Sequence, residues 1–302
     1  MTSVTLAPAP AGLGPPNMWG KLVRSLLIGP RGVGWNVDAS WRELGYLHPP
    51  EEALAARQHD RIRSLLLAGG VDLVEPDRPL PGLTPDAVYC HDASFPSRRG
   101  MILMRMGKET RSGEPAAHAR IYEGQGIPVV GAIEAPGLAE GGDLVWLDEH
   151  TLLAGEGYRT NAAGIAQLGE ILAEDGVEVI SVPLPFGDGP RCCLHLMSLI
   201  SVLDQRTMVA DLRFLGVPTF EMLKARGWEF IPIVEGERPT MAANVLALGG
   251  RTLLAIAANR ETNARLGDAG FEVLTYEGSE ISQNGSGGPT CLTRPLVRQA
   301  AS

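Results

Sequence analysis

The chain has few of the features that mark several common classes of protein. Its 302 residues include only four cysteines, too few for a disulfide scaffold, and adjacent Cys192 and Cys193 could pair only with strain, so reduced thiols are expected. No stretch approaches the roughly 18 consecutive apolar residues of a membrane span. Residues 1–16 lack the basic start and apolar run of a signal peptide. These absences favour a cytoplasmic protein.

Clustered positive charge is also missing. Lys and Arg total 26 against 35 Asp and Glu, the formal net charge is -9, and no Lys/Arg-rich run occurs. Nucleic-acid affinity depends on neutralising phosphates with clustered positive charge, so no nucleic-acid partner is expected. The composition is that of a globular protein, with 44% hydrophobic residues and a length that can bury a sizeable core.

A phrase in which Gly precedes a short β-branched or aromatic run recurs five times. Most copies follow a stretch with helical periodicity, so each Gly is expected to end a helix in a left-handed conformation before a strand begins. Before three of the helices, two apolar runs flank a tight polar turn, which predicts hairpins with turns at residues 148–150, 204–206 and 249–251. The glycines are Gly70, Gly126, Gly176, Gly227 and Gly270, and the predicted helices span residues 53–68, 162–174, 219–226 and 262–269.

The repeated unit is therefore strand, turn, strand, helix, Gly, strand. Copies spaced 43 to 56 residues apart point to an array or a closed propeller, whereas an ordinary α/β sandwich with coincidental glycines is the alternative. If the copies close into a ring, the residues just before the first strand of each hairpin face one central cavity. Polar and potentially reactive side chains occur at those positions, in residues 89–92, 140–143, 193–196 and 289–292.

Cys291 ends a Gly-rich loop, residues 285–291, directly before an apolar segment. A thiol on a flexible loop beside a strand can act as a nucleophile if something lowers its pKa, although free cysteines are also common buried residues.

His195 sits among Cys, Leu, Met and Ile, where an imidazole is more often a hydrogen-bonded core residue than a catalyst. Catalysis by Cys291 with His195 needs proximity in space and not in sequence. A metal site of Cys192, Cys193 and His195 is disfavoured, because adjacent cysteines rarely chelate one ion.

Acidic residues occur at two of the expected cavity positions. Glu140 and Asp143 flank two glycines, which would let the backbone come close to a ligand. Asp86 and Asp92 would lie on one face of an extended strand. Most Asp and Glu are solvated turn residues, but four acidic groups in one cavity would favour a cationic substrate.

Arg111 and Arg159 follow the second strands of two repeats. The planar fork of arginine can donate two parallel hydrogen bonds to a ligand carboxylate, although each residue alone is more often a surface side chain. A cavity with carboxylates at one end and two arginines at the other would fit an amino acid that carries a distal cation, arginine above all.

Taken together, these phrases resemble the guanidino-group-modifying enzymes of the pentein superfamily, which includes arginine deiminases, dimethylarginine dimethylaminohydrolases and amidinotransferases. The resemblance covers roughly residues 20–298 and implies a five-bladed, pseudo-symmetric α/β propeller of ββαβ repeats, in agreement with the repeat count. It implies one catalytic domain over residues 19–298, after a flexible tail of residues 1–18. The phrases are residues 86–92, Glu140-Gly-Gly-Asp143, Leu194-His-Leu196 and Gly287-Gly-Pro-Thr-Cys291.

Within the superfamily the chain looks most similar to the dimethylarginine dimethylaminohydrolases, through the Asp86-x5-Asp92 spacing and the phrases around Arg111 and Arg159. That resemblance implies a role for each candidate residue. Cys291 would be the nucleophile, His195 the general acid and base, Glu140 the carboxylate near the imidazole and the guanidinium, Asp92 the guanidinium clamp, Arg111 and Arg159 the ligands of the substrate carboxylate, and Asp86 a residue at the amino-acid end.

Two positions depart from the family patterns. Arginine deiminases have an acidic residue two positions after the histidine, where this chain has Met197. The hydrolases that act on methylated arginine usually have Lys there and an acidic residue before the aspartate, where this chain has His91. An apolar wall at Met197 tolerates N-methyl groups better than a second carboxylate would.

The expected reaction is hydrolysis of the guanidino C–N bond of an arginine-type substrate, above all N-methylated arginine to citrulline and methylamines, through a covalent thiouronium on Cys291. An arginine deiminase, an amidinotransferase and a non-catalytic binding protein on the pentein scaffold are the alternatives. The expected partner is a small guanidino compound, without nucleic acid, membrane, metal or cofactor, and a homodimer is left open.

Overall fold

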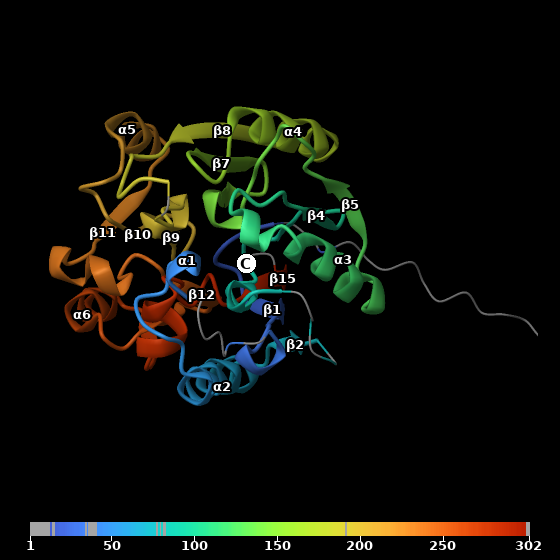
Figure 1. Ribbon diagram of the computed structural model, residues 1–302. Helices are drawn as coiled ribbons and strands as arrows, with labels where there is room; N and C mark the ends of the chain where they lie inside the picture. Colours follow the sequence, from blue (N-terminus) through green and yellow to red (C-terminus); the bar gives the residue numbers. More distant parts are fainter. Residues whose placement is uncertain are drawn as a thin grey trace, which may run out of the picture.

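The computed structural model describes residues 13, 16–33, 35, 41–76, 78, 80, 83–190 and 192–299. In this part of the chain, the strands form five sheets of three strands, arranged in a ring around a common centre (Figure 1). Most of the predicted tail, residues 1–18, lies outside the described residues, so its flexibility stays a prediction. None of the described helices is long and apolar enough to cross a membrane.

Every sheet is built from the predicted unit. Its first two strands pair antiparallel, its second and third pair parallel, and a helix connects the second strand to the third. Two units are β3 (Ser94–Pro96), β4 (Met101–Leu103), α3 (Glu114–Gly124), β5 (Val129–Ala132), and β6 (Leu144–Asp148), β7 (Thr151–Glu156), α4 (Ala162–Leu172), β8 (Glu178–Pro183). Two more are β9 (Ile200–Val202), β10 (Thr207–Ala210), α5 (Val217–Ala225), β11 (Glu229–Pro232), and β12 (Leu246–Gly249), β13 (Thr252–Ile256), α6 (Arg260–Asp268), β14 (Glu272–Tyr276).

The remaining unit closes the ring with strands from both ends of the chain. The last strand, β15 (Arg294–Arg298), pairs antiparallel with β1 (Leu22–Leu26), with Arg294 opposite Leu26. After the short helix α1 (Trp41–Leu44) and the long helix α2 (Glu52–Ala68), β2 (Asp72–Val74) pairs parallel with β1. The five-bladed propeller expected from the repeats is confirmed.

The five repeat glycines end helices or the turns that follow them, as predicted. All five have positive φ, between 64° and 85°, a conformation in which a residue with a Cβ is strained. Helix α5 begins two residues earlier than predicted, at Val217, because Pro218 in its first turn has a φ that already suits a helix. The three predicted hairpins are β6–β7, β9–β10 and β12–β13.

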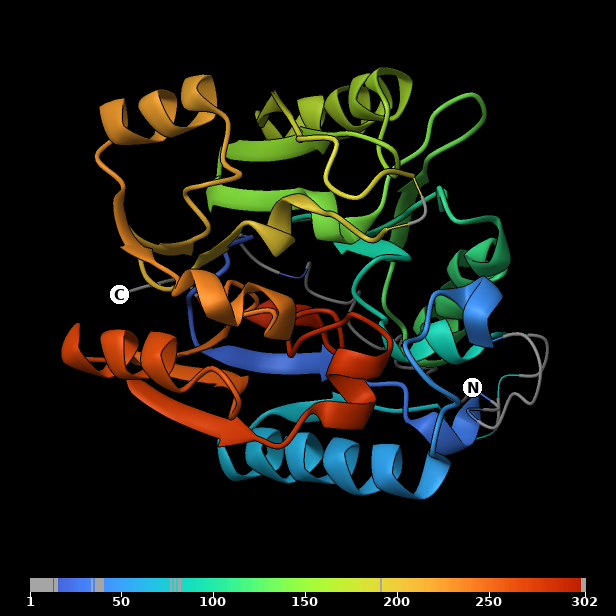
Figure 2. The ribbon, with the colours of Figure 1, turned by 60° about the vertical axis from the view of Figure 1, so that its left-hand side comes forward.

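The helices that connect the second and third strands of each sheet, α2 to α6, lie on the outside of the ring and the strands on the inside (Figures 1 and 2). A middle strand is therefore covered on both faces, and five consecutive residues of β7, from Thr151 to Gly155, are buried. Large side chains fill the space between neighbouring sheets, as where the Phe95 and Trp146 rings stack with centroids 5.6 Å apart. The centre of the ring is left to the loops that precede the first strands.

The closing strand β15 is expected to contribute to stability as much as an internal strand. Leu296 is buried in β15 as Leu153 is in β7, so Leu296→Ala and Leu153→Ala should each lower the free energy of unfolding by about 2–5 kcal/mol, whereas Leu212→Ala at an exposed position should change it by less than about 0.5 kcal/mol. Urea unfolding of the three variants and of the native protein measures these free energies. A near-zero effect of Leu296→Ala alone would mean that the ring closes only loosely.

Candidate active site

The loops before the first strands meet at the ring centre, as the repeat predicted. The Gly141 N–H donates to the Asp92 carbonyl at 2.9 Å, the Leu196 N–H to Asp143 Oδ1 at 3.0 Å, and the His91 N–H to the Cys291 carbonyl at 3.1 Å. Asp143 is buried and accepts this backbone bond. It therefore supports the loop of His195 and does not line a cavity.

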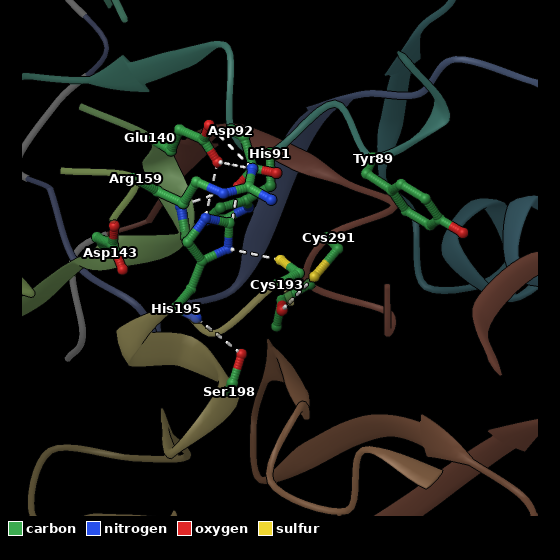
Figure 3. A network of polar contacts seen from close by, with 12 residues as sticks. Tyr89, His91, Asp92, Glu140, Asp143, Arg159, Cys193, His195, Ser198 and Cys291 are labelled. Carbon is green, nitrogen blue, oxygen red and sulfur yellow. Dashed lines mark hydrogen bonds and ion pairs between the residues drawn. The ribbon is translucent and has the colours of Figure 1, made fainter. Parts of the chain in front are cut away.

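Glu140 and His195 form the central contact (Figure 3). His195 Nε2 lies 2.8 Å from Glu140 Oε2, and both side chains are buried. Glu140 Oε1 accepts the Gly107 and Lys108 N–H groups at 2.9 and 3.2 Å, and Arg159 Nη1 lies 3.2 Å from each carboxylate oxygen. Burial alone would raise the pKa of Glu140, but His195 and Arg159 outweigh it and hold the pKa at about 2. Glu140 is therefore an anion.

The other ring nitrogen of His195 faces the cavities. Its Nδ1 lies 3.6 Å from Cys193 Sγ and 3.9 Å from Asp92 Oδ1. Figure 3 shows Cys193 and Cys291 on this side of the ring, away from Glu140. Burial alone would lower the pKa of His195, but its interactions with Cys193 and with the carboxylates of Asp143 and Asp92 raise it well above its ordinary value. A side chain at Gly142 would collide with the imidazole, so glycine is required there.

Cys291 is fixed by Asn244, which the sequence analysis missed. Asn244 Nδ2 lies 3.2 Å from Cys291 Sγ, and Asn244 Oδ1 accepts the Thr290 N–H at 3.0 Å and the Thr290 hydroxyl at 2.7 Å. Asn244 directly precedes β12, the first strand of its sheet. The repeat could therefore have indicated it as a residue that faces the centre. Gly288 in the Gly-rich loop packs so closely on Asn244 that a Cβ would collide with it. The expected flexibility of this loop stays a prediction.

The Cys291 thiol is neutral in the ligand-free protein. Burial, together with the nearby Asp92 carboxylate and Cys193, raises its pKa to about 11, and His195 only partly opposes them. Cys291 nevertheless lines the same cavities as His195. Its activation therefore needs a further positive charge beside the sulfur.

Asp92 is held by Arg111. Arg111 Nη1 donates to Asp92 Oδ2 at 2.6 Å, and its Nε and Nη2 each donate to Glu114 at 2.8 Å. Burial would raise the pKa of Asp92, but the charges of His195 and Arg111 hold it well below its ordinary value. In this state Arg111 positions a carboxylate of the protein, and its role as a ligand of a substrate carboxylate stays a prediction. Glu114 was missed, although its i,i+3 spacing from Arg111 could have indicated it.

Asp86 lies at the other end of the cluster. Its Oδ2 accepts from Lys108 Nζ at 2.5 Å, and the same ammonium donates to the Leu44 carbonyl at 2.6 Å. The expectation that Asp86 and Asp92 share an extended strand is wrong. Pro85–Val88 form a 3₁₀ helix, which Pro85 favours through its fixed φ, and a turn follows at residues 90–93.

Two cavities share the walls formed by Cys193, His195, Ser286 and Cys291. The polar cavity has a volume of about 30 Å³ and is lined by charged side chains. The apolar cavity has a volume of about 370 Å³, and both Met197 and His91 lie in its wall. The charged residues of the polar cavity are Asp86, Asp92, Lys108, Arg111 and Arg159.

Asp92, Glu140 and His195 offer ligand atoms within 4.8 Å of one another, close enough to hold a metal ion. Each carboxylate already has a buried guanidinium partner, Arg111 or Arg159. A metal cation would compete with these partners, so we assign no metal to this group, and the expected metal-free site stays a prediction.

A family model described as arginine deiminase matches residues 79–229 and 221–298. The chain belongs to the arginine deiminase family. Among its relatives, an N(G),N(G)-dimethylarginine dimethylaminohydrolase of Pseudomonas aeruginosa is 31% identical over 82% of this chain and 91% of that protein. A protein of the same description from Streptomyces coelicolor is 30% identical over 80% of this chain and 86% of that protein.

Solved structures of this family have the same fold. A mutant of the Pseudomonas aeruginosa dimethylarginine dimethylaminohydrolase in complex with citrulline has a TM-score of 0.74 and 25% identity, covering 91% of this chain and 99% of that one. The N-terminal domain of ArgZ, a cyanobacterial arginine dihydrolase, has a TM-score of 0.77 at 21% identity, covering 91% and 98%. Membership of the pentein superfamily, inferred from the sequence, is confirmed.

The raised pKa of Cys291 predicts slow alkylation of this residue at neutral pH. Only the thiolate reacts, so the rate with iodoacetamide should rise about tenfold per pH unit from pH 7 to about pH 10. Peptide mass spectrometry would follow Cys291 separately from exposed Cys192, and Cys291→Ser is the blank. A plateau already at pH 8 would contradict the neutral thiol.

The Asn244 amide should stabilise the thiolate of Cys291, because a hydrogen bond to a charged group contributes about 1.5–3 kcal/mol. Asn244→Ala should therefore move the alkylation curve of Cys291 to higher pH by about 1–2 units. Asn263→Ala, which removes an amide that bonds the Ile256 carbonyl in another part of the ring, is the matched control. Superimposable curves for Asn244→Ala and the native protein would exclude the assigned contact.

Proposed function

We propose that this protein hydrolyses the guanidino C–N bond of an arginine-type substrate, and that N-methylated arginine, converted to citrulline and methylamines, is preferred over arginine. One observation carries the proposal. Cys291 and His195 line the same cavity beside Asp92, while His195 is bound through its far nitrogen to an anionic Glu140. A thiol, an imidazole and buried carboxylates are the groups that attack on a guanidinium requires.

Binding is the first task of the site. A guanidinium is a planar cation with N–H donors, and Asp92 and Glu140 already bind such groups in Arg111 and Arg159. The described contacts of Arg159 use Nη1, which leaves Nε and Nη2 to bind the substrate carboxylate. Asp86 would receive the substrate ammonium in place of Lys108. These roles follow the family pattern. They are supported by the position of Asp86, Asp92 and Arg159 in the wall of the polar cavity, whereas Glu140 lies behind His195.

The cationic substrate also activates the nucleophile. Its positive charge beside Cys291 lowers the pKa of the thiol, so the thiol releases its proton to solvent as the guanidinium binds. The thiolate then attacks the central carbon and forms the S–C bond. His195, whose raised pKa favours the imidazolium, donates a proton from Nδ1 to the departing nitrogen, the C–N bond breaks, and the amine leaves.

Hydrolysis returns the site to its starting state. The neutral imidazole of His195 takes a proton from a water molecule whose oxygen attacks the thiouronium carbon. The C–O bond forms, the S–C bond breaks, the departing sulfur takes the hydroxyl proton of the adduct, and the ureido product leaves with the neutral thiol restored. Glu140 stays an anion throughout and stabilises each imidazolium state of His195.

Met197 supports the preference for methylated arginine. It is buried two residues after His195, where a carboxylate would be needed to bind the second face of an unsubstituted guanidinium. A thioether accepts hydrogen bonds only weakly but makes favourable contacts with methyl groups. The proposed reaction needs reduced thiols, which agrees with the predicted cytoplasmic location. That location and a homodimeric state stay predictions.

The test is citrulline formation from arginine, monomethylarginine and asymmetric dimethylarginine under identical conditions. We expect both methylated substrates to have a higher kcat/KM than arginine, and Cys291→Ser to form no citrulline while its urea midpoint stays close to that of the native protein. Mass spectrometry of enzyme quenched during turnover should show a thiouronium adduct on Cys291. Faster turnover of arginine would make the protein a deiminase, and turnover by Cys291→Ser would exclude the mechanism.

A further inference from the structure

The apolar cavity begins where the reaction takes place. It shares Cys193, His195 and Cys291 with the polar cavity, so the reacting sulfur and imidazole lie at the boundary of the two. Its volume of about 370 Å³ falls in the 300–1,000 Å³ range of small-molecule sites. The apolar part of its wall consists of Leu194, Met197, Leu199, Phe214 and Met241.

The position of this boundary determines which part of a substrate would enter the apolar cavity. The amino-acid end of an arginine-type substrate is charged, and its counter-charges Asp86 and Arg159 line only the polar cavity. The guanidino carbon must lie at Cys291. A substituent on the distal guanidino nitrogen, which becomes part of the leaving amine, therefore points across Cys291 into the apolar cavity.

The cavity is far larger than methyl groups require. A methyl group is about the size of a water molecule, which occupies ~30 Å³ in the liquid, so two methyl groups would leave most of the space empty. A cavity of about 370 Å³ has room for a chain or ring of several carbon atoms.

The charged groups that line this cavity are balanced or lie at its opening. Asp211 and Arg238 form an ion pair, with Nη2 to Oδ1 at 2.9 Å, and the Arg238 guanidinium lies 4.5 Å from the centre of the Phe214 ring. His91 is bonded to the Thr293 carbonyl at 2.8 Å and to Arg294 at 3.0 Å, and burial together with the charge of Arg294 lowers its pKa to about 3, so it is neutral. Asp188 is exposed.

The cavity also has its own opening to solvent. Asp188 and Cys192 are exposed and line this cavity but not the polar one, whereas Met197 and Leu199 in its wall are buried. An amine released at Cys291 could therefore leave through this opening without crossing the charged polar cavity.

We propose that the apolar cavity binds the leaving group, and that the preferred substrates are arginine derivatives whose distal guanidino nitrogen carries an apolar substituent larger than methyl, of about four or more carbons. This inference rests on the proposed function and extends its substrate class. The reaction is unchanged. Sulfur bonds to the guanidino carbon, the C–N bond to the substituted nitrogen breaks, and His195 supplies the proton to the departing alkylamine. Attack by water then regenerates the thiol.

The first test compares Nω-methyl-, Nω-butyl- and Nω-benzyl-L-arginine by citrulline formation. Because the additional carbon atoms are buried against apolar side chains, the butyl substrate should have a kcat/KM at least tenfold above that of the methyl substrate. If the methyl substrate reacts and the butyl substrate is tenfold worse, the leaving-group site is wrong and the proposed function stands. If no arginine derivative yields citrulline, both the proposed function and the leaving-group site are wrong.

The second test places the substituent in the cavity. Phe214→Trp reduces the space, and Met197→Lys introduces a charge, so each should lower the butyl-to-methyl ratio of kcat/KM at least fivefold. Leu212→Trp, on the same loop as Phe214 but exposed and outside the cavity wall, is the matched control and should keep the native ratio. If both variants fold and keep the native butyl-to-methyl ratio of kcat/KM, the proposal is wrong. If Phe214→Trp does not fold, the ratio measured for Met197→Lys decides alone.

Discussion

The buried carboxylate of Glu140 is the contact on which the centre of this structure depends. A fully buried anion is stable only when hydrogen bonds and positive charges surround it. Glu140 obtains them from three sheets of the ring, because Gly107 and Lys108 follow β4, Arg159 follows β7 and His195 precedes β9. One side chain thereby joins three repeats and sets the orientation of the imidazole. The propeller and the active site are built around the same residue.

Around this contact, the protein holds its reactive groups in an inactive but prepared state. The carboxylates Asp92 and Glu140 are paired with Arg111 and Arg159, and the thiol of Cys291 is neutral. A cationic substrate changes both conditions, since it competes for the carboxylates and lowers the pKa of the thiol. Nucleophile and substrate thus activate each other, which protects a buried cysteine from reaction with other electrophiles when no substrate is bound.

The two cavities differ in charge and in size. The polar cavity is lined by paired charges and is nearly filled by its own side chains, whereas the apolar cavity is open and large. Met197 and His91, the two positions that depart from the family patterns, both line the apolar cavity. The departures therefore lie in the cavity that we propose for the leaving group, whereas Cys291, His195, Glu140 and Asp92 keep the family pattern.

The sequence alone was sufficient to determine the five repeats and the positions of Cys291, His195 and Glu140 in loops that face the centre, because a positive φ at glycine and the alternation of strand and helix are local properties. Only the tertiary structure decided what those residues contact. Asn244 on Cys291, Cys193 on His195 and Glu114 on Arg111 depend on how the loops pack. The 3₁₀ helix that begins at Pro85 corrected the expectation that Asp86 and Asp92 share an extended strand. The pairing of the buried charges and the volume of the apolar cavity were also decided only by the tertiary structure. They arise from distances between segments of different sheets, which no local pattern in the chain records.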